Sequence, residues 1–398
     1  MKTQELDQYT PAGVSFHSTV RQARIRGENL VQHFRKTNFG DQPPELDILY
    51  TPTEAARMVG VSTQAIRTAE EDGRLPQPTR NEKGRKLGYS FHDVQRMRSI
   101  FNKMPCRAED DEVVVLCFSN YKGGAYKTSS SVHFAQGCAE QGYRILFIDL
   151  DPQGTASHYF RRMPGTVTTE QTIGPTLLRR DGAELINFEP TQWPNIDLVP
   201  ASSGLFLVEM EMTRYEKELY GDHGHSSFEA LMISLDDLIA NYPQQWDMVV
   251  IDCPPALGHL TLNAIVASDI CIVPTPAHYA DYVSTIEYFG LLESMFEALE
   301  DSLSIDLRIL ITRFNSNDDE STFMHQRIKE TFKELVLRNV IAYTGEVGKG
   351  LIKMRSIYEQ PKELRGDRRA FLRARGIFDN VNNEILDSVV KPLWKSYQ

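Results

Sequence analysis

The sequence lacks the features that would place it in a membrane or outside the cell. Its 398 residues hold no run near the roughly 20 apolar residues of a membrane helix, and no apolar segment follows a basic start as in a signal peptide. The five cysteines are scattered and have no C-x-x-C spacing. This pattern argues against a disulfide framework or a zinc motif. We therefore expect a cytoplasmic protein with reduced thiols and no membrane partner.

Basic charge is also scarce, and it is unevenly distributed. The chain has 43 Lys+Arg against 54 Asp+Glu, a net charge of −11, which argues against a protein that coats nucleic acid with its whole surface. Residues 1–107 nevertheless carry 17 basic and 12 acidic residues, whereas the rest carry 26 and 42. The length predicts about two to three domains. A local basic surface in the amino-terminal part needs its own explanation.

Changes of pattern divide the chain into three predicted domains, at residues 1–47, 48–107 and 108–398. The first contains a basic helical stretch over 14–37, which ends before Pro43-Pro44 because a proline pair cannot continue a helix. The second is compact and basic, and an acidic linker follows it near residue 110.

The third domain alternates short apolar runs with helix-period stretches. Such runs are typical of strands in a parallel sheet that is buried on both faces. We therefore predict an α/β fold whose ligands bind beyond the carboxyl ends of the strands. The predicted strands are residues 113–118, 144–149, 248–252, 270–273 and 307–311.

The first of these runs leads into a glycine-containing loop, a Lys-Thr pair and a helical pattern, which is the layout of a P-loop. Backbone N–H groups and the helix start are expected to cradle phosphates. Lys127 is expected to reach the β- and γ-phosphate oxygens, and the Thr128 hydroxyl to bind Mg²⁺. The expected nucleotide-binding residues are Gly123, Gly124, Ala125, Tyr126, Lys127, Thr128 and Ser129.

Three acids follow other predicted strands. Asp252 ends the apolar run 248–251 and is placed to hold Mg²⁺ through water. Asp149 and Asp151 follow the second run, and alternation puts both on one side, near the phosphates. One of the two is placed to orient the attacking water. A single aspartate here would be read as a loop cap, but three beside a P-loop favour a catalytic site.

The combined motifs resemble those of ParA-type partition ATPases. They correspond to the deviant Walker A, A′ and B motifs of that family, and residues from about 111 to 398 follow the family pattern. The arrangement is most similar to the larger plasmid ParA proteins and to RepA of replication–partition cassettes. The motifs are Lys122-Gly123-Gly124-x-x-Lys127-Thr128, Asp149-Leu150-Asp151-Pro152-Gln153-Gly154 and Val250-Ile251-Asp252-Cys253-Pro254-Pro255.

The resemblance implies a role for each motif. Lys122 would reach the ATP of the partner in a nucleotide-sandwich homodimer, where a second cation offsets charge on the transferring phosphoryl group. Asp151 would be the hydrolytic acid, with Asp149 supporting the site. Thr312 and Arg313 would lie near the base. The resemblance also implies ATP/ADP and Mg²⁺ as cofactors, and a ParB-like centromere-binding partner.

One residue departs from the usual P-loop pattern. Tyr126 stands before Lys127, where most P-loops have glycine. A bulky ring there could change the loop geometry or slow hydrolysis. This residue keeps open the alternative of a nucleotide-gated repressor that does not hydrolyse ATP.

Residues 50–101 resemble the winged helix of MerR-like regulators. Thr53 is expected to cap a first helix that Gly60 ends, and Ser62 to cap a second. The second helix would enter the major groove of DNA. The expected DNA-binding residues are Thr63, Gln64, Arg67 and Thr68 on this helix, and Arg80, Lys83, Arg85 and Lys86 on a following wing.

Two further basic regions are harder to interpret. A basic amphipathic helix such as 14–37 is suited to binding membrane, DNA or its own copy in a dimer. We favour dimerisation with incidental DNA contact, because large ParA proteins have such a helix. Near the carboxyl end, a basic run reads first as a solvated face, but the family resemblance places non-specific DNA contacts there, with Arg375 and Lys353 as candidates. The absence of a basic amphipathic helix after residue 385 disfavours a membrane-cycling role.

The leading hypothesis is a nucleoid-associated partition ATPase. ATP would drive a dimer that binds DNA non-specifically, a ParB-like partner would stimulate hydrolysis, and the ADP or apo form would bind its operator as an autorepressor. The nucleotide-gated repressor is the alternative. A third, remote hypothesis is a nitrogenase-iron-protein-like reductase, which would need cluster-binding cysteines that the spacing of Cys253 does not supply.

Overall fold

The computed structural model describes residues 16–39, 46–75, 78, 82, 84, 86–163, 165–178, 186–220, 227–297, 304–360 and 367–397. The chain divides into two compact units, Met1–Glu45 and Leu46–Gln398. The described part of the first unit is helix α1 (Phe16–Phe39), where the predicted basic helix lies. Its apolar residues Phe16 and Leu30 are exposed.

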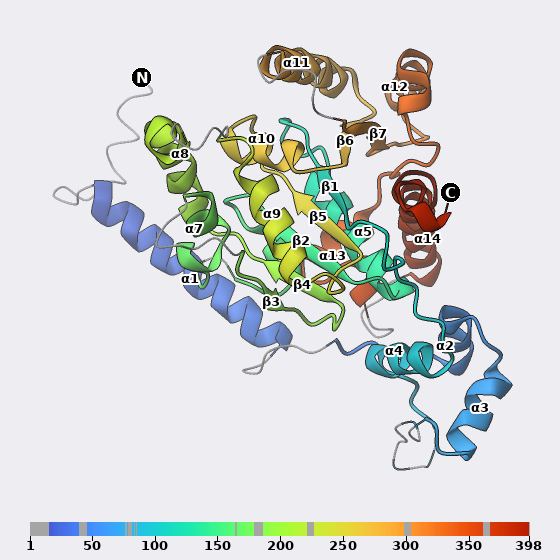
Figure 1. The fold of residues 1–398 in the computed structure, drawn as a ribbon. Helices are drawn as coiled ribbons and strands as arrows, with labels where there is room; N and C mark the ends of the chain where they lie inside the picture. Colours follow the sequence, from blue (N-terminus) through green and yellow to red (C-terminus); the bar gives the residue numbers. More distant parts are fainter. Residues whose placement is uncertain are drawn as a thin grey trace, which may run out of the picture. The chain divides into compact units, whose positions relative to one another are not determined.

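The second unit is built on a seven-stranded sheet of order β3-β4-β2-β5-β1-β6-β7 (Figure 1). All neighbouring strands are parallel except β3, which pairs with β4 in the antiparallel sense. The five predicted strands are confirmed, and β3 and β4 are additional. The strands are β1 (Val114–Phe118), β2 (Ile145–Asp149), β3 (Glu189–Pro190), β4 (Ile196–Val199), β5 (Met248–Asp252), β6 (Ile270–Pro276) and β7 (Asp306–Thr312).

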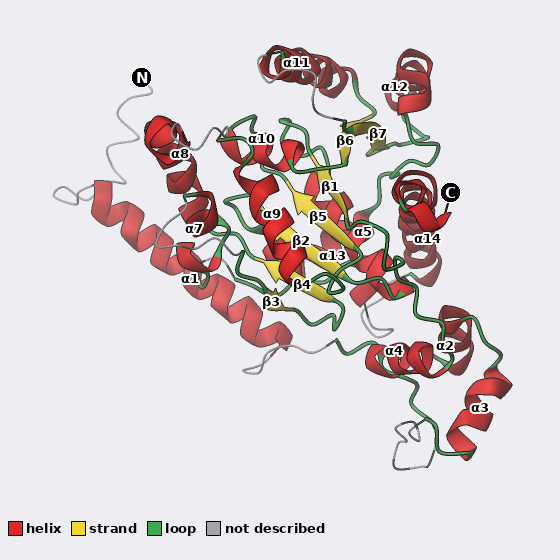
Figure 2. Ribbon diagram, viewed as in Figure 1, coloured by secondary structure: helices red, strands yellow, loops and turns green. Residues whose placement is uncertain are grey.

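Helices connect these strands and cover both faces of the sheet (Figure 2). They are α5 (Lys127–Gln141), α6 (Thr155–Tyr159), α7 (Gly174–Leu177), α8 (Gly204–Tyr220), α9 (Ala230–Asn241), α10 (His259–Val266), α11 (Tyr279–Phe296), α12 (Asp319–Phe332), α13 (Gly345–Ile352) and α14 (Arg368–Ile385). Short 3₁₀ turns include Thr169–Gln171, Lys333–Leu335 and Ile357–Glu359. After α14 the chain ends in a π turn, Leu386–Val390, and two 3₁₀ turns, Lys391–Leu393 and Lys395–Tyr397. We call this sheet with α5 to α14 the sheet domain.

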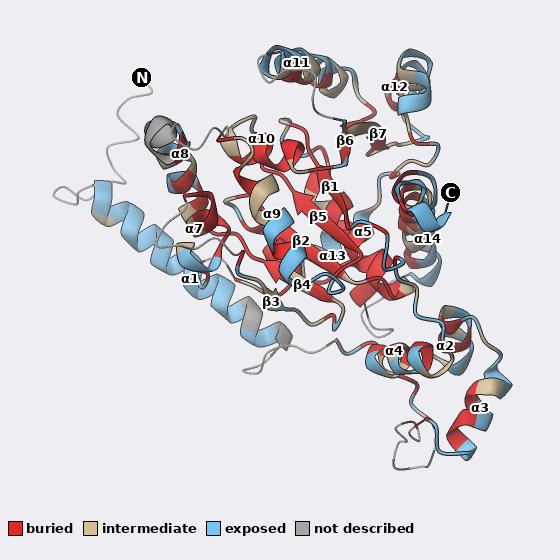
Figure 3. Ribbon diagram, in the orientation of Figure 1, coloured by how far each residue is buried: buried red, intermediate tan, exposed pale blue. Residues whose placement is uncertain are grey.

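Alternation along the strands separates two cores, because successive side chains point to opposite faces. Leu116 and Phe118 of β1 pack with α5 and α14, whereas Val115 and Cys117 pack with α7 to α11. The central strands are buried throughout (Figure 3). This explains why their sequences read as continuous apolar runs.

The helix-turn-helix consists of α2 (Pro52–Val59), α3 (Thr63–Glu71) and α4 (Phe91–Ile100). The cap of α2 is Thr51, so the prediction of Thr53 was wrong. Pro52 occupies the first turn, and Thr51 and Glu54 form a reciprocal capping box, which satisfies two free N–H groups. Gly60 ends the helix in the left-handed conformation (φ 74°), and Ser62 caps α3, both as predicted.

The wing is described only in part. Tyr50 and Tyr89 form an antiparallel bridge, and Ser90 then caps α4. Of the predicted wing contacts, Arg80, Lys83 and Arg85 lie outside the described residues.

The helix-turn-helix packs against the carboxyl end of α5. Phe91 contacts Trp193 edge to face, with ring centroids 5.0 Å apart. Arg98 is 1% exposed and donates to the backbone oxygen of Glu140 at 2.6 Å. The Tyr50 hydroxyl donates to Glu140 Oε1 at 3.2 Å. Helix α5 therefore leads from the P-loop to the helix-turn-helix.

The cysteines are free thiols, as the sequence predicts. Cys106 is exposed and the other four are buried. Among the described helices, none has both the length and the apolar character needed to cross a membrane.

Candidate nucleotide site and DNA-binding surface

The predicted P-loop connects β1 to α5. Its backbone enters the left-handed region at Gly124 (φ 77°) and Tyr126 (φ 72°). Asn120 braces the loop, because its Oδ1 accepts from the N–H of Lys122 at 3.0 Å and its Nδ2 donates to the oxygen of Pro274 at 2.9 Å. The loop thus has a fixed shape at the carboxyl edge of the sheet.

Tyr126 holds a conformation that ordinarily favours glycine. For a side-chain-bearing residue, the left-handed region costs roughly 1–2 kcal/mol. The ring is half-buried and packs against the core on the α5 face. Burial raises its pKa, while the nearby Arg313 lowers it. This backbone strain lies in the phosphate loop, where strained residues tend to have a functional role.

Lys127 is the first residue of α5 and is only 6% exposed. Its Nζ donates to the backbone oxygen of Lys122 at 3.0 Å. Burial lowers its pKa, and the neighbouring Asp252 opposes this shift. A desolvated cation at a helix start is well suited to binding phosphate.

The strand register brings the predicted acids to the same edge. Asp149 and Asp252 are paired neighbours on β2 and β5, and Asp252 also pairs with Phe118, where the P-loop begins. Both carboxylates are fully buried. The three motifs therefore converge as the parallel-sheet rule predicts.

Asp252 has the features of a magnesium-site residue. Its Oδ1 accepts from the Ser131 hydroxyl at 3.1 Å. Within the described part of the chain, its buried Oδ2 has no hydrogen-bond partner. Burial and then the charge of Asp149 raise its pKa, while the neighbouring Thr128 side chain lowers it. An oxygen donor without a partner beside Thr128 fits Mg²⁺, which prefers oxygen ligands.

Asp149 and Asp151 differ in their surroundings. Asp149 Oδ2 accepts from the backbone and the hydroxyl of Ser157 at 2.8 and 2.7 Å, and its Oδ1 accepts from the N–H of Asp151 at 3.1 Å. Burial raises the pKa of Asp149 to about 7, against these hydrogen bonds. Asp151 is 8% exposed, and its carboxylate accepts only from the N–H of Gln153 among the described hydrogen bonds. Asp149 thus shapes the loop, and Asp151 has spare oxygen acceptors.

Lys122 points away from its own loop. Its side chain is 40% exposed, and its Nζ lies 3.8 Å from Asp281 Oδ1 on α11. The side chain is therefore available at the surface.

Thr312 and Arg313 border the other side of the loop. The Thr312 hydroxyl donates to the oxygen of Ala125 at 3.1 Å, and Arg313 has a left-handed backbone (φ 53°). A polar cavity of about 400 Å³ follows β7, with Asn315, Tyr343 and Arg373 among its lining residues.

One buried histidine supports the loop from within α5. His133 donates from Nδ1 to the oxygen of Ser129 at 2.6 Å, because its Nε2 accepts from the N–H of Ile357 at 3.3 Å. Its ring stacks on Phe378 with centroids 4.0 Å apart. Burial lowers its pKa to about 4, so it is neutral at physiological pH.

The recognition helix α3 presents its polar residues outward. Thr63, Gln64, Arg67 and Thr68 are all exposed, whereas Ile66 and Ala69 face the core. On the wing, Lys86 pairs with Glu70, whose Oε1 also accepts from the Tyr89 hydroxyl at 2.6 Å. Lys86 therefore ties the wing to α3.

The two carboxyl-terminal candidates lie in different environments. Arg375 donates to the Glu140 carboxylate, and its guanidinium lies 4.9 Å from the centre of the Tyr358 ring. Its side chain is 17% exposed, so most of it is engaged inside the protein. Lys353 is half-buried in the turn after α13, and the exposed arginines of α14 are Arg368, Arg369 and Arg373.

Sequence reasoning missed several supporting residues, among them Ser131, Asn120 and Asp281. Ser131 lies one helical turn beyond Thr128, so helical spacing could have identified it. Asn120 and Asp281 carry no motif, since their roles depend on how β1, β6 and α11 meet.

Comparisons with known proteins agree with this geometry. A family model described as an AAA domain matches residues 113–305, and one described as a MerR HTH family regulatory protein matches residues 50–102. Protein SopA of Escherichia coli (strain K12) is 36% identical over 388 residues, which cover 95% of this chain and 98% of SopA.

Two further proteins extend the comparison. The chromosome partitioning protein ParA of Myxococcus xanthus (strain DK1622) is 30% identical over 238 residues, covering 57% of this chain and 76% of ParA. A solved structure of a partition protein shares the fold with a TM-score of 0.65 at 18% identity, over 94% of this chain and 98% of that one.

The fold and the site define a P-loop protein joined to a helix-turn-helix domain. The similarity to SopA spans nearly the whole of both chains, and ParA shares the sheet domain. The chain belongs to the ParA-type plasmid partition ATPases that carry an amino-terminal helix-turn-helix.

Proposed function

We propose that this protein is an ATP-hydrolysing DNA segregation protein that also represses its own operon. One observation carries the proposal: a single helix, α5, starts with the buried Lys127 and has Glu140 in its last turn, where Glu140 holds the helix-turn-helix. Nucleotide chemistry and operator binding thus share one rigid element.

At the start of α5, loop N–H groups and Lys127 bind the phosphates of ATP. Thr128 and Asp252 hold Mg²⁺, with the Asp252 Oδ2 atom as an acceptor that has no protein partner among the described residues. The bound ion neutralises charge on the phosphate oxygens. Asp151 orients the attacking water, while Asp149 keeps the loop after β2 in place.

The base lies on the side of the loop that Thr312 and Arg313 border. The polar cavity after β7 has the volume and the amide and hydroxyl groups that a purine requires. Tyr126 lies near Arg313 and near Tyr343, and Tyr343 lines this cavity.

ATP promotes a homodimer, in which Lys122 leaves Asp281 and contacts the nucleotide of the partner. Its exposure and its long 3.8 Å ion pair support this role, because little holds the side chain in place. Helix α1 supplies a second dimer contact through its exposed apolar residues.

DNA binding has two modes. In the ADP or apo form, α3 enters the major groove of the operator with Thr63, Gln64, Arg67 and Thr68. In the ATP dimer, basic residues near the carboxyl end bind nucleoid DNA in the cytoplasm without sequence preference. There the exposed Arg373 and the half-buried Lys353 supply contacts, whereas Arg375 is engaged with Glu140. A ParB-like partner stimulates hydrolysis and releases the DNA.

The test measures ATP hydrolysis and DNA binding for wild type and for Lys127→Ala. We expect the variant to lose ATP turnover, whereas Lys329→Ala, a partly exposed lysine on α12, keeps it. Operator and random DNA are then compared with ADP, ATP and a non-hydrolysable analogue. Equal rates of ATP hydrolysis by wild type and Lys127→Ala would refute the proposed ATPase activity. If the preference for operator over random DNA is the same with every nucleotide, the proposed coupling between nucleotide and DNA binding is refuted.

The second candidate is a nucleotide-gated repressor, which the strained Tyr126 favours. It predicts operator binding that responds to ATP without turnover, even with DNA and partner present. The reductase hypothesis finds no support, because Cys253 is fully buried and presents no thiol at a surface.

A further inference from the structure

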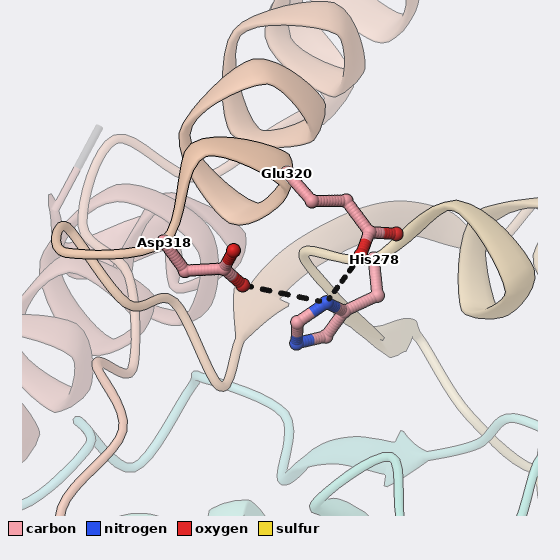
Figure 4. A group of neighbouring side chains, drawn as sticks. All are labelled: His278, Asp318 and Glu320. Atoms are coloured by element: carbon pink, nitrogen blue, oxygen red, sulfur yellow. Dashed lines mark ion pairs between the residues drawn. The ribbon is translucent and has the colours of Figure 1, made fainter.

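Three metal-binding side chains gather outside the nucleotide site, where the β6–α11 and β7–α12 connections meet (Figure 4). His278 is the residue before α11, and Asp318 and Glu320 lie at the start of α12. Nothing in the nucleotide chemistry described above uses them.

The distances between the imidazole and the two carboxylates are more suited to a shared metal ion than to direct hydrogen bonds. His278 Nδ1 lies 3.9 Å from Asp318 Oδ2 and 3.7 Å from Glu320 Oε2, both too long for a hydrogen bond. All three donor atoms lie within 4.8 Å of one another. Two atoms bound to one zinc ion at about 2.1 Å in tetrahedral geometry are about 3.4 Å apart. Binding therefore needs side-chain rotations that bring pairs of these atoms closer by up to about 1.4 Å.

Helix capping accounts for only one of the four carboxylate oxygens among the described hydrogen bonds. Asp318 occupies the cap position of α12, yet its side chain makes no capping hydrogen bond. Glu320 uses Oε1 to accept from the N–H of Tyr279 at 3.0 Å. This bond aims the other oxygen, Oε2, at His278, much as an outer hydrogen bond orients a metal ligand.

We infer that His278, Asp318 and Glu320 bind a zinc ion, with water in the fourth position. One imidazole nitrogen and two carboxylate oxygens form a donor set that Zn²⁺ accepts in tetrahedral geometry. Mg²⁺ is disfavoured, because it prefers six oxygen ligands. The ion joins the starts of α11 and α12, and the first turn of α11 carries Asp281, the partner of Lys122. The site thereby fixes the turn that holds Lys122.

The test uses the full chain, treated with a chelator and returned to excess Mg²⁺ so that the nucleotide site is filled. Titration calorimetry with Zn²⁺ is expected to show one ion per chain. His278→Gln and Asp318→Asn should each weaken binding at least tenfold. Asp319→Asn is the matched control, because Asp319 is the exposed neighbour of Asp318 and lies outside the cluster.

One spectroscopic and one thermal measurement distinguish loss of the zinc site from loss of the fold. Co²⁺ in place of Zn²⁺ should give a tetrahedral visible spectrum in wild type and Asp319→Asn, but not in Asp318→Asn. Zinc should raise the melting temperature in the first two only, while the zinc-free melting temperatures agree in all three. Absence of saturable binding to wild type, or equal weakening by Asp318→Asn and Asp319→Asn, would overturn the inference.

Discussion

The nucleotide site and the DNA-binding surface use charge in opposite ways. Lys127, Asp149 and Asp252 are buried, so water cannot screen the interactions of these ionisable groups. Arg67 and its neighbours on α3 are exposed, and salt screens them. The same residue types therefore serve a fixed, desolvated site in one region and an adaptable surface in the other.

This difference decides how each region responds to change. A buried charge that loses its partner carries the full desolvation penalty, whereas an exposed charge loses only a screened interaction. Substitutions at the buried end should thus have large effects that salt does not alter. Those on α3 should have smaller effects that depend on salt.

The largest expected effect is at Asp151. Asp151→Asn removes the acid that orients water, so kcat for ATP hydrolysis should fall at least about 100-fold. The Kd for ATP should change by less than about threefold, because Lys127 and the loop still bind the phosphates. Single-turnover hydrolysis and nucleotide titration measure the two quantities. Asp237→Asn, an exposed control on α9, should leave both unchanged; similar rates for the two variants would rule out the catalytic role.

The second prediction compares a buried and an exposed ion pair. Glu140→Gln leaves Arg375 with only Asp379, 3.6 Å away, and should lower the free energy of unfolding by about 2–3 kcal/mol. Glu330→Gln breaks the exposed pair with Arg327 and should cost less than about 0.5 kcal/mol. Urea unfolding of both variants gives the difference. A smaller loss for Glu140→Gln than for Glu330→Gln would contradict the assignment of Glu140 as a buried anchor.

The third prediction concerns pH and His133. Its pKa falls from the ordinary 6.5 to about 4 on folding, so the unfolded chain binds the extra proton between these values. The stabilisation is therefore complete above pH 6.5 and is lost as the pH falls toward 4. Between pH 6.5 and 5 the loss is about 2 kcal/mol.

His133→Phe keeps the stacking on Phe378 but removes the titrating group. The variant should be less stable than wild type at pH 7, where the two hydrogen bonds are missing. Its unfolding free energy should change by about 2 kcal/mol less over the same pH interval. Parallel pH slopes for the two proteins would show that His133 does not titrate as described.

The smallest expected effect is on the exposed surface. Arg67→Ala should weaken operator binding by about tenfold, or about 1.4 kcal/mol. If Arg67 contacts a phosphate, the variant should also reduce the slope of log affinity against log salt concentration by about 1. Arg327→Ala removes the same charge from α12 and should leave the operator affinity intact. Fluorescence anisotropy at several salt concentrations measures both, and an unchanged affinity for Arg67→Ala would remove α3 from the operator contact.

Much of the fold was predictable because its signals are local. The apolar runs predicted five of the seven strands, β1, β2, β5, β6 and β7, since strands buried on both faces need apolar residues at nearly every position. The loop from Gly123 to Ser129 and the three aspartates followed from the rule that parallel strands end at one edge. Gly60 and Ser62 were predictable from backbone and capping chemistry. The cap of the first helix was predicted at Thr53 but is Thr51, because Pro52 suits the first turn and Glu54 completes the capping box.

The remaining features depend on contacts between distant segments. The ion pair of Lys122 with Asp281 requires the packing of α11 beside the loop, which no spacing encodes. Likewise, Arg375 looked like a surface arginine in a basic run. Its burial against Glu140 and Tyr358 follows from the docking of α14 on α5.

The shared contact at Glu140 also limits how such proteins can be recombined. The tyrosine at 50 and the arginine at 98 come from the helix-turn-helix, the glutamate from the P-loop helix and the arginine at 375 from α14. A chimera that exchanges only residues 48–107 would replace Tyr50 and Arg98 but keep their buried partner, Glu140, which would then lose these hydrogen bonds unless the new domain supplies the same side chains. To change the operator that this protein recognises while keeping its stability, the exchange must either preserve Tyr50 and Arg98 or stay within the exposed face of α3.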